Sequence, residues 1–208
     1  MAQQQETLRL RLKDSHDGVA MLLLVAMNHR LQTRMAAQGI FALDSYFDLT
    51  TITVWPIFKR VLDAHVASLQ TIDARLLVLQ APPPRGTAAH AVTERYRQFA
   101  FACLTVEKNE MSEQMMAQSM STLRRAMGGF LSRMGAALRP AGGAQAQGPP
   151  YCEPQRLFLL GNTYAILEQL QRFPAEQDES AVADAVEFWQ LRLASHVDEY
   201  RPSLPFHA

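Results

Sequence analysis

Six histidines and two cysteines are the side chains of this 208-residue sequence best suited to metal binding or nucleophilic chemistry. The histidines occupy positions 16, 29, 65, 90, 196 and 207, and no two of them have the three- or four-residue spacing that a metal site on one helix requires. Cys103 and Cys152 are 49 positions apart and lack the Cys-x-x-Cys spacing typical of zinc sites. We therefore predict no metal site, no disulfide framework and no cofactor.

Recognised catalytic motifs are also missing from the sequence. It contains no P-loop, no dinucleotide-binding glycine motif, no His-Glu-x-x-His and no Gly-x-Ser-x-Gly. His65 and His196 lie beside apolar stripes, where a histidine at the edge of a core is a simpler explanation than a catalytic base. We predict that the protein is not an enzyme. The alternative is a bundle with a ligand or catalytic site between helices, for which the candidate polar residues are Asn28, His29, Arg30 and His65.

Methionine and arginine gather between residues 111 and 139, where they could form a surface for a partner. Methionine is flexible and suits adaptable binding grooves, although core filling in an ordinary bundle explains the same pattern. The arginines in this stretch could contact an acidic partner or a phosphoinositide. The predicted partner-binding residues are Met115, Met120, Met127, Arg124 and Arg125.

Charge is balanced over the whole chain, with 20 basic and 20 acidic residues, and this gives no reason to expect nucleic acid as a partner. The balance hides an asymmetry, because residues 120–152 carry four arginines and no acid while residues 176–199 carry seven acids and one arginine. The acidic stretch is explained as the solvated face of a helix. The longest apolar run has nine residues, whereas a membrane span needs roughly 20.

Helix-forming residues dominate between the Gly- and Pro-rich stretches, and no run alternates with the period of a strand. We predict an all-α fold, an elongated bundle of about five to six helices. The first helix is expected to start near Asp14-Ser15, to be buried on nearly all sides in its first half, and to end before Gly39. The second follows Asp44 and contains Pro56, where a kink or break is expected.

Later helices are expected from near residue 87 to residue 138, as one long helix or two, then from Glu153-Pro154, and finally from Asp178 or Ser180. The predicted organisation has five segments along the chain. They are a flexible N-terminus (1–13), a helical bundle (14–139), a flexible linker (140–152), a helical hairpin that packs on the bundle (153–200) and a tail (201–208).

Three stretches in this order resemble a known family. They are Tyr46-Phe47 leading to Val-Trp-Pro-Ile-Phe at 54–58, His-Ala-Val-Thr-Glu-Arg-Tyr-Arg-Gln-Phe at 90–99, and Arg-Leu-Phe-Leu-Leu-Gly-Asn-Thr-Tyr-Ala-Ile-Leu at 156–167. Together they are similar to the C-terminal half of the vacuolar protein sorting-associated protein 52 family over roughly residues 16–170. The residues that carry the motifs, for which a structural role is expected, are Trp55, Pro56, Tyr96, Phe99 and Tyr164.

The resemblance implies a non-catalytic subunit of the Golgi-associated retrograde protein complex, a helical-rod tether that captures endosome-derived vesicles. It implies the other subunits of that complex as partners, with a Rab-type GTPase and SNARE proteins as further ones. It also implies peripheral association, through these partners, with the cytoplasmic face of the trans-Golgi network and endosomes. The family's long N-terminal coiled coil has no counterpart here, so we expect a C-terminal piece of a longer tether. A generic helical adaptor outside this family is the alternative.

Overall fold

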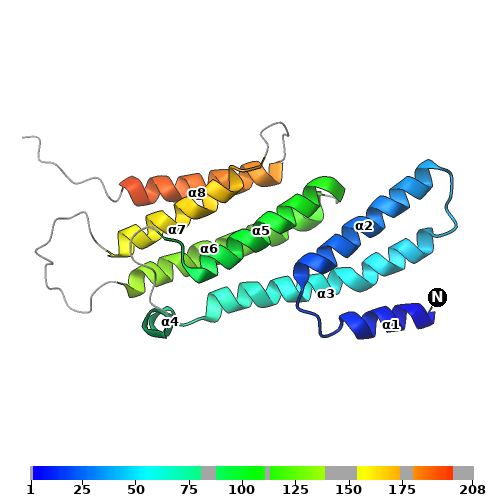
Figure 1. Ribbon diagram of the computed structural model, residues 1–208, viewed down its shortest axis with the longest axis horizontal. Helices are drawn as coiled ribbons and strands as arrows, with labels where there is room; N and C mark the ends of the chain where they lie inside the picture. Colours follow the sequence, from blue (N-terminus) through cyan, green and yellow to red (C-terminus); the bar gives the residue numbers. More distant parts are fainter. Residues whose placement is uncertain (1, 81–87, 111–112, 139–153, 174–179, 199–208) are drawn as a thin grey trace, which may run out of the picture. The chain divides into compact units, whose positions relative to one another are not determined.

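The computed structural model describes residues 2–80, 88–110, 113–138, 154–173 and 180–198, and within these ranges all regular secondary structure is α-helical (Figure 1). This confirms the predicted all-α class. The described part contains eight helices rather than the predicted five to six: α1 (Ala2–Leu12), α2 (Gly18–Ala37), α3 (Asp44–Thr71), α4 (Ala74–Gln80), α5 (Ala91–Glu110), α6 (Glu113–Ala137), α7 (Pro154–Leu170) and α8 (Ser180–Asp198).

Three features account for the higher count. Helix α1 lies in the segment predicted to be a flexible N-terminus, and the short helix α4 follows α3 directly. Helices α5 and α6 are separate, which decides between the two alternatives for residues 87–138. The predicted linker at 140–152 and the tail at 201–208 lie outside the described residues.

Two compact units make up the chain, and neither is continuous in sequence. Unit 1 consists of Met1–Ser68 and Phe99–Leu123, and unit 2 consists of Leu69–Gln98 and Arg124–Ala208. Helices α5 and α6 therefore each contribute residues to both units.

In unit 1, α2 and α3 are consecutive helices joined by a short turn. Asp17 caps α2, with its Oδ1 accepting a hydrogen bond from the amide of Ala20 at 3.0 Å, so the cap lies after the predicted Asp14-Ser15. The predicted end of the helix before Gly39 is confirmed. Gly39 has a φ of +73°, in the left-handed region that glycine adopts without steric cost. The amide of Ile40 then donates to the carbonyl of Met35 at 3.0 Å and closes the turn.

The apolar interior of unit 1 includes Leu22 and Val25 of α2 and Val54, Phe58 and Leu62 of α3. A buried polar contact sets the register of the two helices. Asn28 Nδ2 donates to the carbonyl of Phe47 at 2.8 Å and to Thr51 Oγ1 at 3.0 Å. A buried amide needs such partners, because a polar group left unpaired in the interior destabilises the fold.

Pro56 does not interrupt α3, which continues from Asp44 to Thr71. A kink or a break was predicted there; the break is wrong, and the kink stays a prediction. Trp55 is half-buried beside Pro56, with its ring centroid 5.3 Å from that of Phe58. Phe99 lies 5.2 Å from the ring of His65 and also faces Gly18, where an added Cβ would come within 3.3 Å of its ring. Phe99 thus packs against both α2 and α3.

Unit 2 is built around α7 and α8, which contact each other extensively, and the last part of α6. Pro154 is the first residue of α7, as predicted, since a first-turn residue has no helical partner for its amide. Phe130, Met134, Phe158, Ile166 and Trp189 are buried in the interior of this unit.

Candidate protein-interaction surfaces

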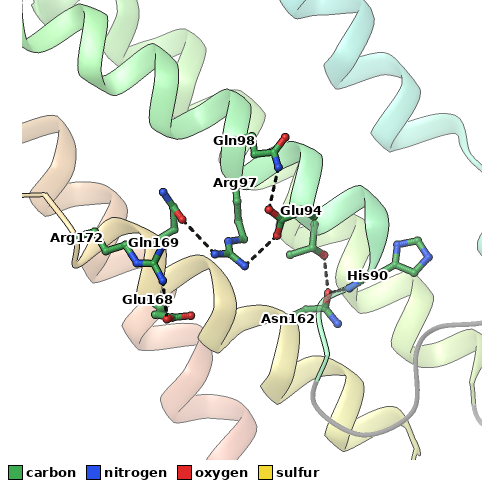
Figure 2. A network of polar contacts seen from close by, with 9 residues as sticks. His90, Glu94, Arg97, Gln98, Asn162, Glu168, Gln169 and Arg172 are labelled. Carbon is green, nitrogen blue, oxygen red and sulfur yellow. Dashed lines mark hydrogen bonds and ion pairs between the residues drawn. The ribbon is translucent and has the colours of Figure 1, made fainter.

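Asn162 is the centre of a buried polar cluster that joins α5 to α7 (Figure 2). Its Oδ1 accepts hydrogen bonds from the amide of His90 at 2.8 Å and from Thr93 Oγ1 at 2.6 Å. Its Nδ2 donates to the carbonyl of Phe158 at 2.7 Å. Thr93 and Asn162 are completely buried, so this cluster holds two helices together and does not meet solvent.

His90 serves the same junction by capping α5. Its ring Nδ1 accepts from the amide of Val92 at 3.2 Å, and its carbonyl accepts from the amide of Glu94 at 3.0 Å. Its ring lies 6.2 Å from the rings of both Phe130 and Phe158. Because Nδ1 is an acceptor and the ring is packed in the interior, His90 acts as a structural residue.

A second line of polar contacts follows α5 toward the end of α7 (Figure 2). Arg97 forms an ion pair with Glu94 at 3.0 Å and donates to Gln169 Oε1 at 3.1 Å. Gln98 Nε2 donates to Glu94 Oε1 at 3.0 Å. These contacts extend the α5–α7 junction from the interior to the edge of the unit.

Arginine side chains from α6 and α8 both contact the ring of Phe188. The guanidinium carbon of Arg124 lies 5.7 Å from the ring centroid and that of Arg192 lies 5.3 Å from it. Arg192 Nη1 also donates to the carbonyl of Gly128 at 3.0 Å. A Cβ at Gly128 would come within 2.6 Å of Arg192 Cζ, so glycine is what allows this approach.

Tyr96 packs against Trp189, with the ring centroids 6.0 Å apart in an edge-to-face arrangement. Burial raises the pKa of Tyr96 to about 12, while Trp189 and the positive charge of Arg124 act in the opposite direction. Tyr96 is therefore a neutral residue that packs against Trp189.

The residues predicted to bind a partner fall into different environments. Met120 and Met127 are buried, Arg124 is 9% exposed, and Arg125 is exposed. The side chain of Met115 lies outside the described residues. Much of the methionine-rich segment thus fills the interior, which was the alternative explanation, and partner binding by Arg125 stays a prediction. Tyr164, expected to be structural, is 60% exposed on α7.

The polar residues proposed for a ligand site do not come together. Asn28 is buried in its contact with α3, whereas His29, Arg30 and His65 are exposed. Partial burial of the His65 ring beside Phe99, followed by the charge of His16, lowers the pKa of His65. Within the described ranges, no three His, Cys, Asp or Glu side chains lie close enough to hold a metal ion. No helix in these ranges is long and apolar enough to span a membrane.

Large apolar side chains remain exposed on α2, although the sequence pattern predicted burial on nearly all sides of the first half of this helix. Leu23, Met27 and Leu31 are 47%, 54% and 50% exposed. Their spacing of four residues could have indicated this exposed stripe from the sequence, because it places all three side chains on one side of a helix. Exposed apolar side chains that share one side of a helix are suited to contact another protein.

The chain resembles one family in comparisons with known proteins. The family model described as "Vps52, C-terminal" matches residues 1–183. Vacuolar protein sorting-associated protein 52 A of Arabidopsis thaliana is 28% identical over 163 residues, 76% of this chain and 20% of that protein. Vacuolar protein sorting-associated protein 52 homolog of Homo sapiens is 24% identical over 189 residues, 91% of this chain and 23% of that protein.

The chain thus spans about a fifth to a quarter of the length of these two relatives. No solved structure matched it significantly. The three stretches that carried the resemblance all lie inside the matched range, and two of them, 90–99 and 156–167, meet at Asn162.

Proposed function

The chain belongs to the Vps52 family, because its residues 1–183 match the family's C-terminal domain, and we propose that it is a non-catalytic subunit of a multisubunit vesicle-tethering complex. The proposed process is endosome-to-Golgi retrograde transport, and the proposed place is the cytoplasmic face of the trans-Golgi network and endosomes. The family match over residues 1–183 is the observation that carries this proposal.

The proposed mode of action is recognition of other proteins. The partners are the other subunits of the Golgi-associated retrograde protein complex, with a Rab-type GTPase and SNARE proteins as further ones, and these partners bring the chain to the membrane. The helical-rod architecture of tethering subunits is part of the same proposal. Exposed leucine and methionine side chains on α2 support recognition, because clustered apolar side chains at a surface are typical of protein-interaction sites.

Affinity purification tests this proposal. The full chain carrying an epitope tag is expressed in cells, and the recovered proteins are quantified against those recovered with the tag alone. We expect the other subunits of the complex in fixed proportion to the chain, and a fluorescent version of the chain should overlap a trans-Golgi marker. Recovery of no subunit, together with a diffuse distribution, would reject the proposal.

A further inference from the structure

The side of α2 that faces away from α3 carries a ridge of large apolar side chains, here called the outer stripe: Leu23, Met27 and Leu31. With about 100° of rotation per residue, Met27 lies about 200° around the helix from Val25, which is buried in the core. The inner side of α2 already forms its contacts through Val25 and its neighbours and through Asn28. The outer stripe is therefore not needed to hold α2 on α3.

The shape of the outer stripe suits a helix. Residues four apart form a ridge that runs nearly along the helix axis, and the stripe from Leu23 to Leu31 extends for about 12 Å at 1.5 Å per residue. Such a ridge packs into the groove of a second helix whose own side chains repeat every four residues. An extended peptide would instead bind to the open edge of a sheet, and the described part of the chain has no strand.

The charged side chains of α2 itself are basic. Helix α2 contains no acidic residue between Gly18 and Ala37, whereas Arg34 follows the stripe residue Leu31 by three positions. Side chains three apart on a helix are neighbours, so Arg34 borders the stripe. Electrostatic complementarity then favours a partner with acidic side chains beside its apolar ridge.

We propose that the outer stripe of α2 docks an amphipathic helix of a partner protein, with a leucine-like ridge at four-residue spacing and acidic residues along its flank. This inference rests on the proposed function, since it states the chemistry by which a partner subunit would be recognised. It adds a surface that neither the family match nor the relatives' names assign.

The direct test is a binding titration on the full chain. A fluorescently labelled, designed helical peptide carries leucines at four-residue spacing and glutamates on the flank, and a matched peptide carries lysine in place of every glutamate. We expect saturable binding of the glutamate peptide with a Kd in the micromolar range by fluorescence anisotropy. The lysine peptide should bind at least tenfold more weakly.

Variants assign the binding to the outer stripe. The combination of Leu23→Ser, Met27→Ser and Leu31→Ser should weaken the glutamate peptide at least tenfold, and Arg34→Glu should reduce its preference over the lysine peptide. The matched controls are Ile52→Ser, 67% exposed on α3, and Arg95→Glu, exposed on α5, and both should bind like the parent. Because the replaced side chains are exposed, the helical circular dichroism spectrum should be unchanged.

Several results would overturn the inference. They are no saturable binding of the glutamate peptide, equal binding of the lysine peptide, or binding that survives the triple serine variant. Stripe-dependent binding to phosphatidylserine vesicles in place of the peptide would show a membrane surface instead. Stripe-dependent dimerisation in sedimentation, again without peptide binding, would show a second copy of the chain.

The purification experiment separates this inference from the proposed function. Recovery of the complex subunits without peptide binding would leave the function standing and remove the docking surface. Peptide binding without recovery of any subunit would support the docking surface on α2 and reject the proposed function.

Discussion

Replacing Asn162 by alanine removes an acceptor that two donors of unit 2 share. The amide of His90 stands just before the first residue of α5, so it has no helical acceptor and depends on Asn162 Oδ1 at 2.8 Å. The hydroxyl of Thr93, completely buried, donates to the same oxygen at 2.6 Å. A buried donor left unpaired costs about 1–3 kcal/mol, so the two together predict a loss of about 2–6 kcal/mol in the free energy of unfolding of unit 2.

Asn28→Ala is the matched control, because Asn28 is also a buried asparagine but acts through its donor atoms. Its partner carbonyl, that of Phe47, lies inside α3 and can accept from the amide four residues further on. Little is left unpaired when Asn28 is removed, so we expect a loss of about 1 kcal/mol in unit 1.

Urea denaturation followed by tryptophan fluorescence measures both effects. The chain has two tryptophans, Trp55 in unit 1 and Trp189 in unit 2. In a Trp55→Phe background the fluorescence reports on Trp189, and in a Trp189→Phe background it reports on Trp55. Equal losses for Asn162→Ala and Asn28→Ala, or a loss below about 1 kcal/mol at Asn162, would refute the argument from orphaned donors.

Three further predictions concern helix geometry and protonation. Pro56→Ala should raise the melting temperature of unit 1, because α3 is continuous at this position and alanine supplies the backbone amide that proline lacks. A lower melting temperature would show that α3 depends on a bend caused by the proline. Gly128→Ala should stabilise unit 2 by less than it does when Arg192 is already replaced by alanine, where the gain is up to about 1 kcal/mol, because the added Cβ displaces the Arg192 guanidinium from the Gly128 carbonyl. Denaturation of the four chains of this double-mutant cycle measures the difference, and equal gains would contradict the argument. The pKa of His65 in the folded chain is lowered below 6.5, so this histidine binds a proton more readily in the unfolded chain, and the stability should fall as the pH drops through about 6.5. His65→Gln should flatten that part of the stability-versus-pH profile. An unchanged profile would show that His65 does not cause the pH dependence.

Local signals in the sequence predicted the helices that have clear ends. Pro154 opens α7 and Gly39 closes the turn after α2 because each residue favours its backbone conformation regardless of distant contacts. Helices α1 and α4 were not predicted, since neither has a long apolar stripe, and α4 has only seven residues. The helical class was thus accessible, and the number of helices was not.

Long-range contacts explain what the sequence could not predict about the candidate sites. The bond from His90 to Asn162 joins residues 72 positions apart, and no spacing rule connects them. The same limit applies to α2, whose apolar residues predict burial but do not show which side a neighbour covers. At Met127 the pattern fits either a core or a docking face, and only the fold shows that the side chain is buried.

The order in which a ribosome makes this chain has a consequence for its two units. Unit 1 is complete only when synthesis reaches Leu123. By then the first segment of unit 2, Leu69–Gln98, has been made, but its second segment, which begins at Arg124, has not. Neither unit can be completed before part of the other has emerged. No single cut leaves both units intact. A cut after Leu123 keeps unit 1 whole but separates Leu69–Gln98 from the rest of unit 2, and a cut before Leu69 keeps unit 2 whole but removes Met1–Ser68 from unit 1. The two units are therefore tied together in biosynthesis and in any attempt to divide the protein into fragments.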